Sequence, residues 1–298
     1  MIDAVVVLHD SADVVEPCLS SLREAAPRRG LRLHVVDNAS HDDGPDRAQR
    51  WATEPVLRMR DNRGFAAGVN AVLRHFAGDW LAVINPDVVV PRGALDRLVD
   101  AIEEHPGTGV AGPRARLASG RIEPTVGYFP SLDIERRHAL FLDRLGGRTR
   151  MRETIGHNAS TVDWVSACAW VLAGEAVRSI GPLDEDYFMY YEDVDYCKRL
   201  HQKGYRVLFV PDVEVEHRRG RGSARTIDLP ADGGRALFHY FGKFHPEVMP
   251  ERLERTVTRG WRLRLTLHRT AAWLGRRDSE VLARRYDAAL RGLEAVKA

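Results

Sequence analysis

The chain has 298 residues, of which 44% are hydrophobic and 29% charged, and its formal net charge is +2. This composition is typical of a globular protein with one large domain or two small ones, and it lacks the strong positive charge of a nucleic-acid-binding protein. Cys18, Cys168 and Cys197 are too far apart for a metal-ligand pair and predict no disulfide framework. They favour a reducing compartment.

The N-terminus lacks the positive region and long apolar core of a signal peptide. No stretch approaches the roughly 18 to 20 uncharged residues that a membrane-spanning helix needs. We therefore expect a cytoplasmic protein, and we leave open a peripheral position at the inner face of the plasma membrane.

Strand-like and helix-like patterns alternate over the first 105 residues. Short apolar runs predict strands at residues 4–8, 31–36, 56–59 and 81–84, and amphipathic spacing predicts helices at 12–25, from the sixties to about 76, and at 92–104. This alternation predicts an α/β fold with a doubly wound, mostly parallel sheet of the Rossmann-like kind. No G-x-G-x-x-G follows the first strand and no P-loop motif occurs, so dinucleotide and P-loop binding lose their usual support.

The expected strand at residues 80–91 (WLAVINPDVVVP) ends abruptly at Asn85, Pro86 and Asp87. Ligands gather at the carboxyl ends of strands in open α/β sheets, so a carboxylate at this point is well placed to hold a metal or a phosphate. Asn, Pro and Asp are also ordinary turn residues, and the tripeptide alone favours a turn.

The second half begins with short strand-like pieces at residues 109–131. Residues 132–160, rich in Arg and Gly, predict a mobile excursion. A core segment follows at 162–172, then an acidic and aromatic segment at 183–195, a helix at 196–203 and strands at 206–210 and 213–217.

Two polar clusters in this half are candidates for chemistry. In the acidic segment we assign Asp195 to a helix N-terminus and keep Glu192 and Asp193 as chemical candidates, because aromatic neighbours predict partial burial of their carboxylates. His217 ends the last strand, and Arg218 and Arg219 begin an Arg/Gly loop behind it. A lone histidine is more often structural, but this combination fits a metal-diphosphate site better.

Five segments, taken in order, resemble the GT-A-fold glycosyltransferases of family 2, especially bacterial rhamnosyltransferase-like members. Together they extend over roughly residues 2 to 225, and their order and spacing make the resemblance specific. The segments are VVDNAS (35–40), NRGFAAGVN (62–70), INPDV (84–88), DEDYFMYYEDVDYCKRL (184–200) and VPDVEVEH (210–217).

The resemblance implies a role for each matching residue. It implies that Asp37 binds the pyrimidine base, that Asn62 and Gly64 belong to the same nucleotide cradle, and that Asn85 and Asp87 occupy the D-x-D position. The remaining implied roles are a divalent cation, Mg²⁺ or Mn²⁺, at Asp87 and His217, a general base at Asp193, and an acceptor side lined by Trp164, Asp184 and Glu192.

Three departures from the family pattern weaken single assignments. Asn85 replaces the first Asp of D-x-D, which makes metal dependence less secure. The turn at residues 40–44 is one residue longer than usual and blurs Asp42 against Asp43, and Ser166–Ala167 stands where Ser-Gly is frequent.

These residues predict an inverting, metal-dependent glycosyltransferase. Cleavage of the bond between sugar and diphosphate leaves negative charge, which a cation at Asp87 and the loop from Arg218 can stabilise, while one base at Asp193 activates the acceptor hydroxyl. The resemblance favours dTDP-rhamnose as donor, with other dTDP- or UDP-sugars next, and a glycan, lipid-linked or secondary-metabolite acceptor. The alternatives are a nucleotidyltransferase and a catalytically silent nucleotide-sugar-binding protein.

We expect a catalytic domain at residues 1–245, with a nucleotide-binding half at 1–110 and an acceptor-binding half at 111–245. Residues 246–298 form a basic helical C-terminal extension, and the part from 251 onward has twelve cations against six anions. This extension either lies on an anionic membrane or forms a solvated helical hairpin. Homodimer formation is left open, and no nucleic-acid partner is expected.

Overall fold

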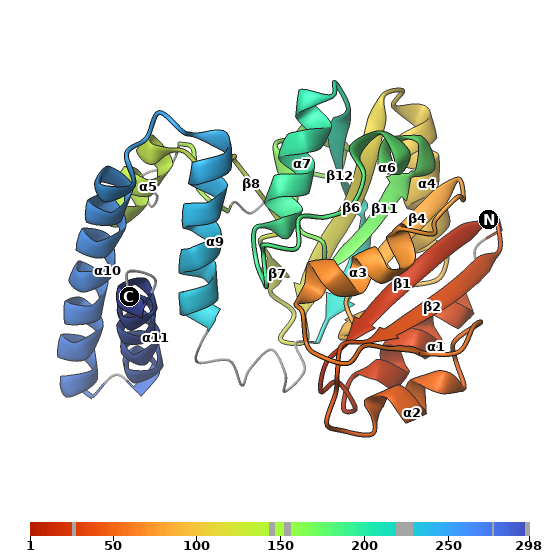
Figure 1. Ribbon diagram of the computed structural model, residues 1–298, viewed down its shortest axis with the longest axis horizontal. Helices are drawn as coiled ribbons and strands as arrows, with labels where there is room; N and C mark the ends of the chain where they lie inside the picture. Colours follow the sequence, from red (N-terminus) through yellow and green to blue (C-terminus); the bar gives the residue numbers. More distant parts are fainter. Residues whose placement is uncertain (26–27, 143–146, 152–155, 219–228, 276, 296–298) are drawn as a thin grey trace. The chain divides into compact units, whose positions relative to one another are not determined.

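A computed structural model of the protein describes residues 1–25, 28–142, 147–151, 156–218, 229–275 and 277–295 (Figure 1). The chain forms two compact units. The sheet unit consists of Met1–Gly127, Met151–Glu185 and Glu192–Ala224, and the helical unit consists of Tyr128–Arg150, Asp186–Tyr191 and Arg225–Ala298. The boundaries expected at residues 110 and 245 stay predictions.

Among the described residues, the sheet unit contains all the strands and most of the short helices. In chain order its elements are β1 (Ile2–Leu8), α1 (Val15–Ala25), β2 (Leu31–Asp37), α2 (Gly44–Gln49), β3 (Leu57–Arg58), α3 (Phe65–Leu73), β4 (Trp80–Ile84), β5 (Val88–Val89), α4 (Ala94–Glu104), β6 (Thr108–Leu117), β7 (Ile122–Glu123), β8 (Val126–Gly127), β9 (Ser160–Val162), β10 (Trp164–Val165), β11 (Ala169–Ala173), α6 (Gly174–Ile180), α7 (Glu192–Gln202) and β12 (Arg206–His217).

The main sheet has the strand order β3-β2-β1-β4-β11-β6-β12-β5. Strands β1 to β4 pair in parallel, as do β6 and β12, while β11 runs antiparallel between β4 and β6. The expected mostly parallel α/β sheet is therefore confirmed. Because β1, β2, β4 and β12 all point the same way, their carboxyl ends meet at one edge of the sheet, where ligands of such folds bind.

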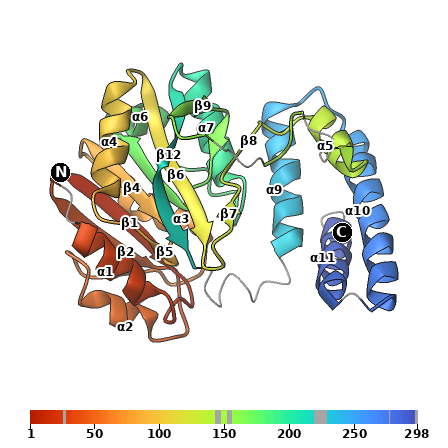
Figure 2. The same cartoon turned by 180° about the vertical axis from the view of Figure 1, so that it is seen from behind.

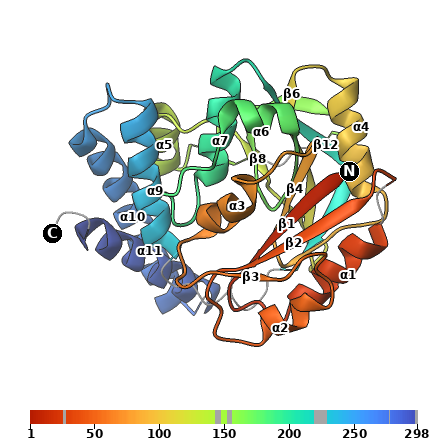
Figure 3. The same cartoon turned by 45° about the vertical axis from the view of Figure 1, so that its right-hand side comes forward.

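Helices cover both faces of this sheet. Helices α1 and α4 lie on one face (Figure 2), and α3, α6 and α7 lie on the other (Figure 3). All seven residues of β1 are buried, as expected for a strand covered on both sides. A Cβ atom at Gly68 of α3 would lie 2.5 Å from Cγ1 of Val7. Gly68 therefore serves helix packing, because only glycine lets α3 approach β1 this closely.

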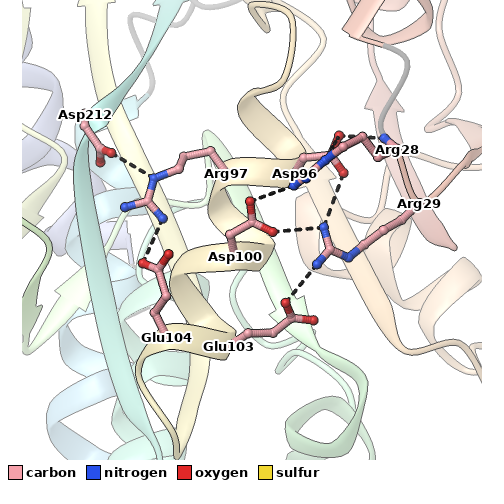
Figure 4. A network of polar contacts seen from close by, with 8 residues as sticks. All are labelled: Arg28, Arg29, Asp96, Arg97, Asp100, Glu103, Glu104 and Asp212. Atoms are coloured by element: carbon pink, nitrogen blue, oxygen red, sulfur yellow. Dashed lines mark hydrogen bonds and ion pairs between the residues drawn. The ribbon is translucent and has the colours of Figure 1, made fainter.

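A network of ion pairs surrounds the exposed side of α4 (Figure 4). Arg29 contacts Glu103 at 2.8 Å, and Arg97 joins Asp212 of β12 at 2.9 Å. Exposed pairs of this kind contribute only about 0 to 1 kcal/mol each. The position of α4 therefore depends mainly on its buried face, which packs in the apolar core.

The helical unit contains α5 (Leu132–Ala139), α9 (Leu229–Phe244), α10 (Pro250–Trp273) and α11 (Arg277–Ala295). Helix α10 packs against α11 and α5, and α11 packs against α9. Arg264 of α10 is 4% exposed and donates hydrogen bonds to the carbonyl oxygens of His138 and Ala139, so it satisfies the C-terminal end of α5. The predicted helical C-terminal region is confirmed.

Two sequence expectations about local structure were wrong. Residues 132–139 form helix α5, and not part of a mobile excursion, because Ser131 caps the helix by accepting a hydrogen bond from Ile134 N and because α5 packs on α10. Helix α7 begins at Glu192, four residues before the expected start at 196, so Glu192 and Asp193 lie in its first turn.

Candidate functional site

Three strand ends bring the predicted polar residues to the carboxyl edge of the sheet. Asp37 is the last residue of β2, and Asn85 and Asp87 follow β4. His217 is the last residue of β12 and pairs with Val88 of β5. The sheet thus brings together residues that are 180 positions apart in the sequence.

Asp37 is fixed as a ligand-binding carboxylate would be. It is 4% exposed, and its Oδ1 accepts a hydrogen bond from Ser40 N at 2.9 Å. Its Oδ2 has no hydrogen-bond partner among the described residues. Ala39, which lies between Asp37 and Ser40 in the sequence, adopts a positive φ of 59°. Such strained conformations are found in tight turns at binding sites. The second oxygen is therefore available to a ligand.

Asn38, which we did not predict, organises the segment behind Asp37. Its Nδ2 donates to Asn62 Oδ1 at 2.8 Å and to Gly64 O at 3.0 Å, and its Oδ1 accepts from Arg63 N. Gly64 has a φ of 87°, a conformation that favours glycine. The predicted cradle residues Asn62 and Gly64 are thus held beside Asp37 through one buried amide.

The structure separates Asp42 from Asp43. Asp42 accepts hydrogen bonds from Ala12 N at 2.8 Å and from Gly44 N at 3.0 Å, so it joins the loop after β1 to the start of α2. Asp43 is exposed and pairs with Arg47 one helical turn later. Asp42 is therefore the structural carboxylate of this turn.

His217 lies between two carboxylates. Its Nε2 is 3.1 Å from Asp87 Oδ1, and its Nδ1 is 2.6 Å from Glu123 Oε2. Burial alone would lower the pKa of His217, but the hydrogen bonds to Asp87 and Glu123 outweigh it and raise the pKa to about 9. At this pKa the ring carries both protons at neutral pH, so Nδ1–H donates to Glu123 and Nε2–H donates to Asp87, and a metal ion at the predicted site would take the place of the Nε2 proton.

Glu123 reaches His217 through two strand pairings. It is the second residue of β7, which pairs antiparallel with β6 at Ala115, and β6 pairs in parallel with β12, with Leu117 opposite His217. The sequence offered no signal for Glu123, because β7 has only two residues and no motif surrounds it.

Asp193 and Glu192 form a perturbed pair in the first turn of α7. Asp193 accepts hydrogen bonds from Ala167 N at 3.3 Å and Val194 N at 2.8 Å. Burial raises its pKa to about 6 despite these bonds. Burial and then the charge of Asp193 raise the pKa of Glu192 to about 8, and its Oε2 has no hydrogen-bond partner within the described part of the chain. At neutral pH the two carboxyls therefore hold one proton between them, and the N–H groups that contact Asp193 favour its ionised form.

Cys168 lies between the turn at Asn85 and the residue that contacts Asp193. Burial, together with the charges of Glu123, Asp87 and Asp193, raises the pKa of the Cys168 thiol to about 12. Cys168 O also accepts a hydrogen bond from Asn85 N at 2.9 Å. The carboxylates near His217 and the carboxylate of α7 thus lie around one residue, as expected if they serve one site.

Glu192 makes stability depend on pH. The folded protein keeps this carboxyl protonated up to about pH 8, whereas an ordinary carboxyl of pKa 4.5 loses its proton earlier, so folding stability falls as pH rises between these values. We expect Glu192→Gln to remove this loss. The free energy of unfolding of the variant, compared with that of the native protein, should therefore be larger at pH 8 than at pH 4.5. Urea unfolding at both pH values measures it, and Glu24→Gln, at an exposed position, should show no such gain.

The remaining predicted residues lie on β10, in the segment before α7 and directly after β12. Trp164 is 6% exposed on β10, and Asp184 is half-buried in the segment before α7. Asn70 of α3 holds that segment through reciprocal hydrogen bonds with the backbone of Leu183 at 2.8 and 2.9 Å. Arg218 is exposed beside Glu216 at 3.2 Å, and Arg219 lies outside the described residues. The roles of these residues stay predictions.

Comparison with known proteins agrees with this architecture. Residues 3–158 match the sequence model of Glycosyl transferase family 2. The N-acetylglucosaminyl-diphospho-decaprenol L-rhamnosyltransferase of Mycobacterium tuberculosis (strain ATCC 25618 / H37Rv) is 32% identical over 241 residues, which cover 76% of this chain and 78% of the relative. The rhamnosyltransferase WbbL of Escherichia coli (strain K12) is 23% identical over 232 residues, which cover 73% of this chain and 83% of the relative.

Solved structures show the same fold. The mannosyltransferase PcManGT from Pyrobaculum calidifontis, in complex with GDP-Man and Mn²⁺, superposes with a TM-score of 0.60 at 17% identity, over 99% of this chain and 86% of that chain. S. aureus TarS residues 1–349 with UDP-GlcNAc superpose with a TM-score of 0.51 at 13% identity, over 99% and 91%. The sheet, with its edge of polar residues, therefore has the GT-A fold that the sequence predicted.

Proposed function

The chain belongs to glycosyl transferase family 2 and is a glycosyltransferase, and from this premise we propose that it inverts the anomeric carbon in a single displacement. The donor is dTDP-rhamnose, with a related dTDP- or UDP-sugar as the next choice, and the acceptor is a hydroxyl of a lipid-linked glycan. The observation that carries the proposal is that the adjacent residues Ala167 and Cys168 contact Asp193 and Asn85, while Asp87 and His217 lie together at the edge that Asp37 also occupies. The names of two rhamnosyltransferase relatives support the sugar.

The residues at His217 fit a divalent cation. Asp87 Oδ1 and His217 Nε2 are 3.1 Å apart and can face the same ion, and Glu123 holds the opposite ring nitrogen as a second carboxylate often does behind a metal-bound histidine. One oxygen and one imidazole nitrogen suit Mn²⁺ well and Mg²⁺ less well. When bound, the ion would offset the negative charge that develops on the diphosphate leaving group.

The chain's own groups supply the other requirements. The N–H groups of Ala167 and Val194 orient the Asp193 carboxylate, which accepts the proton of the acceptor hydroxyl as that oxygen attacks. A single base and no enzyme nucleophile give inversion. The protonated Glu192 carboxyl can donate a hydrogen bond on the acceptor side, and Arg218 lies next in sequence to His217, within reach of a diphosphate.

The proposal is tested by a donor and acceptor screen. Purified protein is incubated with dTDP-rhamnose, UDP-sugars and a GDP-sugar, with Mn²⁺ or Mg²⁺, and with a polyprenyl-diphosphate glycan acceptor. We expect acceptor-dependent release of dTDP with Mn²⁺, and NMR of the product should show the inverted anomer. Transfer with retention, or no release of nucleotide from any donor, would overturn the proposal.

Asp37→Ala should weaken nucleotide binding. The loss of a hydrogen bond to a charged carboxylate costs about 1.5 to 3 kcal/mol, so the Kd for the nucleotide should rise roughly 10- to 150-fold. Calorimetry with dTDP and UDP measures it. Asp43→Ala removes a carboxylate from the same loop that points to Arg47, and it should leave the Kd unchanged. Equal affinities of the native protein and Asp37→Ala would remove Asp37 from the nucleotide site.

A further inference from the structure

Helix α10 has one buried side and one exposed side that carry different chemistry. The buried side includes Leu253, Val257, Gly260, Trp261 and Leu265, and it packs within the helical unit against α5 and α11. A Cβ atom at Gly260 would lie 2.7 Å from Ala139, so this side is closely fitted to α5. The orientation of α10 about its own axis is therefore fixed by packing.

The exposed side of α10 presents large apolar side chains to solvent. Leu263 is 44% exposed, Leu267 51%, Trp273 85% and Leu274 68%. At about 100° per residue, Leu263 and Leu267 lie within roughly 40° of one another around the helix, and Leu274 follows directly after its last residue, Trp273. Exposed apolar residues scattered singly are normal, but a row along one helix indicates a binding surface.

Arginines accompany this apolar row. Arg252, Arg255, Arg259 and Arg262 are exposed on the same helix, and none of the four forms an ion pair with another described side chain. No Asp or Glu occurs between Glu254 and Asp278, a stretch that includes the exposed Arg255, Arg259 and Arg262. The surface is therefore positive as well as apolar, which distinguishes it from an ordinary solvated helix.

We propose that the exposed side of α10 binds the surface of an anionic phospholipid bilayer. The leucines and Trp273 enter the boundary between headgroups and acyl chains, where tryptophan is enriched in membrane proteins, and the arginines contact lipid phosphates. The exposed arginines complement the negative charge of an anionic bilayer, and this favours an anionic membrane over a neutral one. The role of this membrane binding rests on the proposed function, because a lipid-linked acceptor lies in such a membrane.

Binding is measured by co-sedimentation of the full chain with vesicles, which needs neither donor nor acceptor. The vesicles are phosphatidylcholine alone or phosphatidylcholine with a quarter of phosphatidylglycerol. We expect binding to the anionic vesicles only, and we expect it to weaken as salt is raised because the arginine contribution is screened. A failure here leaves the glycosyltransferase proposal intact, since the transfer assay is separate.

Matched variants test which residues carry the binding. Arg255→Gln with Arg259→Gln should weaken partitioning roughly 30-fold, at about 5-fold for each arginine near the surface. The control is Lys203→Gln with Arg206→Gln, which removes the same charge from exposed positions of the sheet unit. Leu274→Ser should weaken partitioning roughly 5- to 10-fold, whereas Leu140→Ser, at a residue 63% exposed on a different element, should not.

Three results would overturn the proposal. The first is equal binding of the native chain to neutral and anionic vesicles, and the second is equal weakening by the α10 variants and their controls. The third is a dimer in analytical ultracentrifugation that Leu274→Ser converts to a monomer, because a second copy of the chain would then cover this surface. Circular dichroism confirms that each variant is folded.

Discussion

Asp193→Asn should reduce the rate of sugar transfer by about 10² to 10⁴-fold, which is the usual contribution of a general base. The amide has the shape of the carboxylate but cannot take a proton, and its single oxygen can accept from only one of the two N–H groups that contact Asp193, Ala167 N or Val194 N. Donor affinity should change little, because the proposed nucleotide contacts lie at Asp37. The variant thus separates proton transfer from binding.

Single-turnover transfer and a separate measurement of donor affinity test this expectation. The matched control is Glu192→Gln, which changes the neighbouring carboxyl in the same way but should keep most of the transfer rate. The native rate should also fall as pH drops below about 6, since the pKa of Asp193 is about 6 and the protonated acid is no base. Near-normal transfer by Asp193→Asn together with an inactive Glu192→Gln would place the base one residue earlier.

Asp87→Ala should reduce activity by about 10²-fold or more, and His217→Ala should reduce it less. Removing a group that stabilises transition-state charge typically costs about 10² to 10³ in rate. The Asp87 change is the more severe because an anionic oxygen suits Mg²⁺ or Mn²⁺ better than imidazole does. Its loss would also leave His217 with one carboxylate partner, Glu123, in place of two.

Metal binding and activity are measured separately for these variants. Mn²⁺ affinity follows from electron paramagnetic resonance of the free ion, and activity is assayed with and without EDTA. Asp100→Ala, at a partly exposed carboxylate of α4, is the control and should bind Mn²⁺ like the native protein. If activity is indifferent to EDTA, no metal takes part, and arginines such as Arg218 must stabilise the leaving group alone.

The sequence predicted best where function coincides with the end of a regular element. Asp37, Asp87 and His217 each follow or end an apolar run, and parallel pairing then brings such ends together. The alternation of patterns was sufficient for this part of the fold because β1, β2, β4 and β12 each contain a run of buried apolar residues. The chemical roles of the three residues still await the measurements above.

The sequence failed where a residue acts through tertiary pairing. Glu123 reaches His217 only because β7 folds back on β6, and a two-residue strand has no periodicity to detect. Asn38 follows the predicted Asp37 in the sequence, but its side chain donates hydrogen bonds to Asn62 and Gly64. The spacing of residues in the sequence does not indicate these contacts. Helix α5 was missed because its arginines hid an apolar side that packs only once α10 is present.

The chemistry of the cysteines has a practical consequence for solution studies. All three thiols are buried, and burial raises the pKa of each, so the reactive thiolate form is scarce at neutral pH. Maleimides and iodoacetamides should therefore leave the folded native chain unmodified. A single cysteine introduced on an exposed element can then carry a fluorophore or spin label without prior removal of the native thiols, and the two units can be followed by distance measurements while a nucleotide binds.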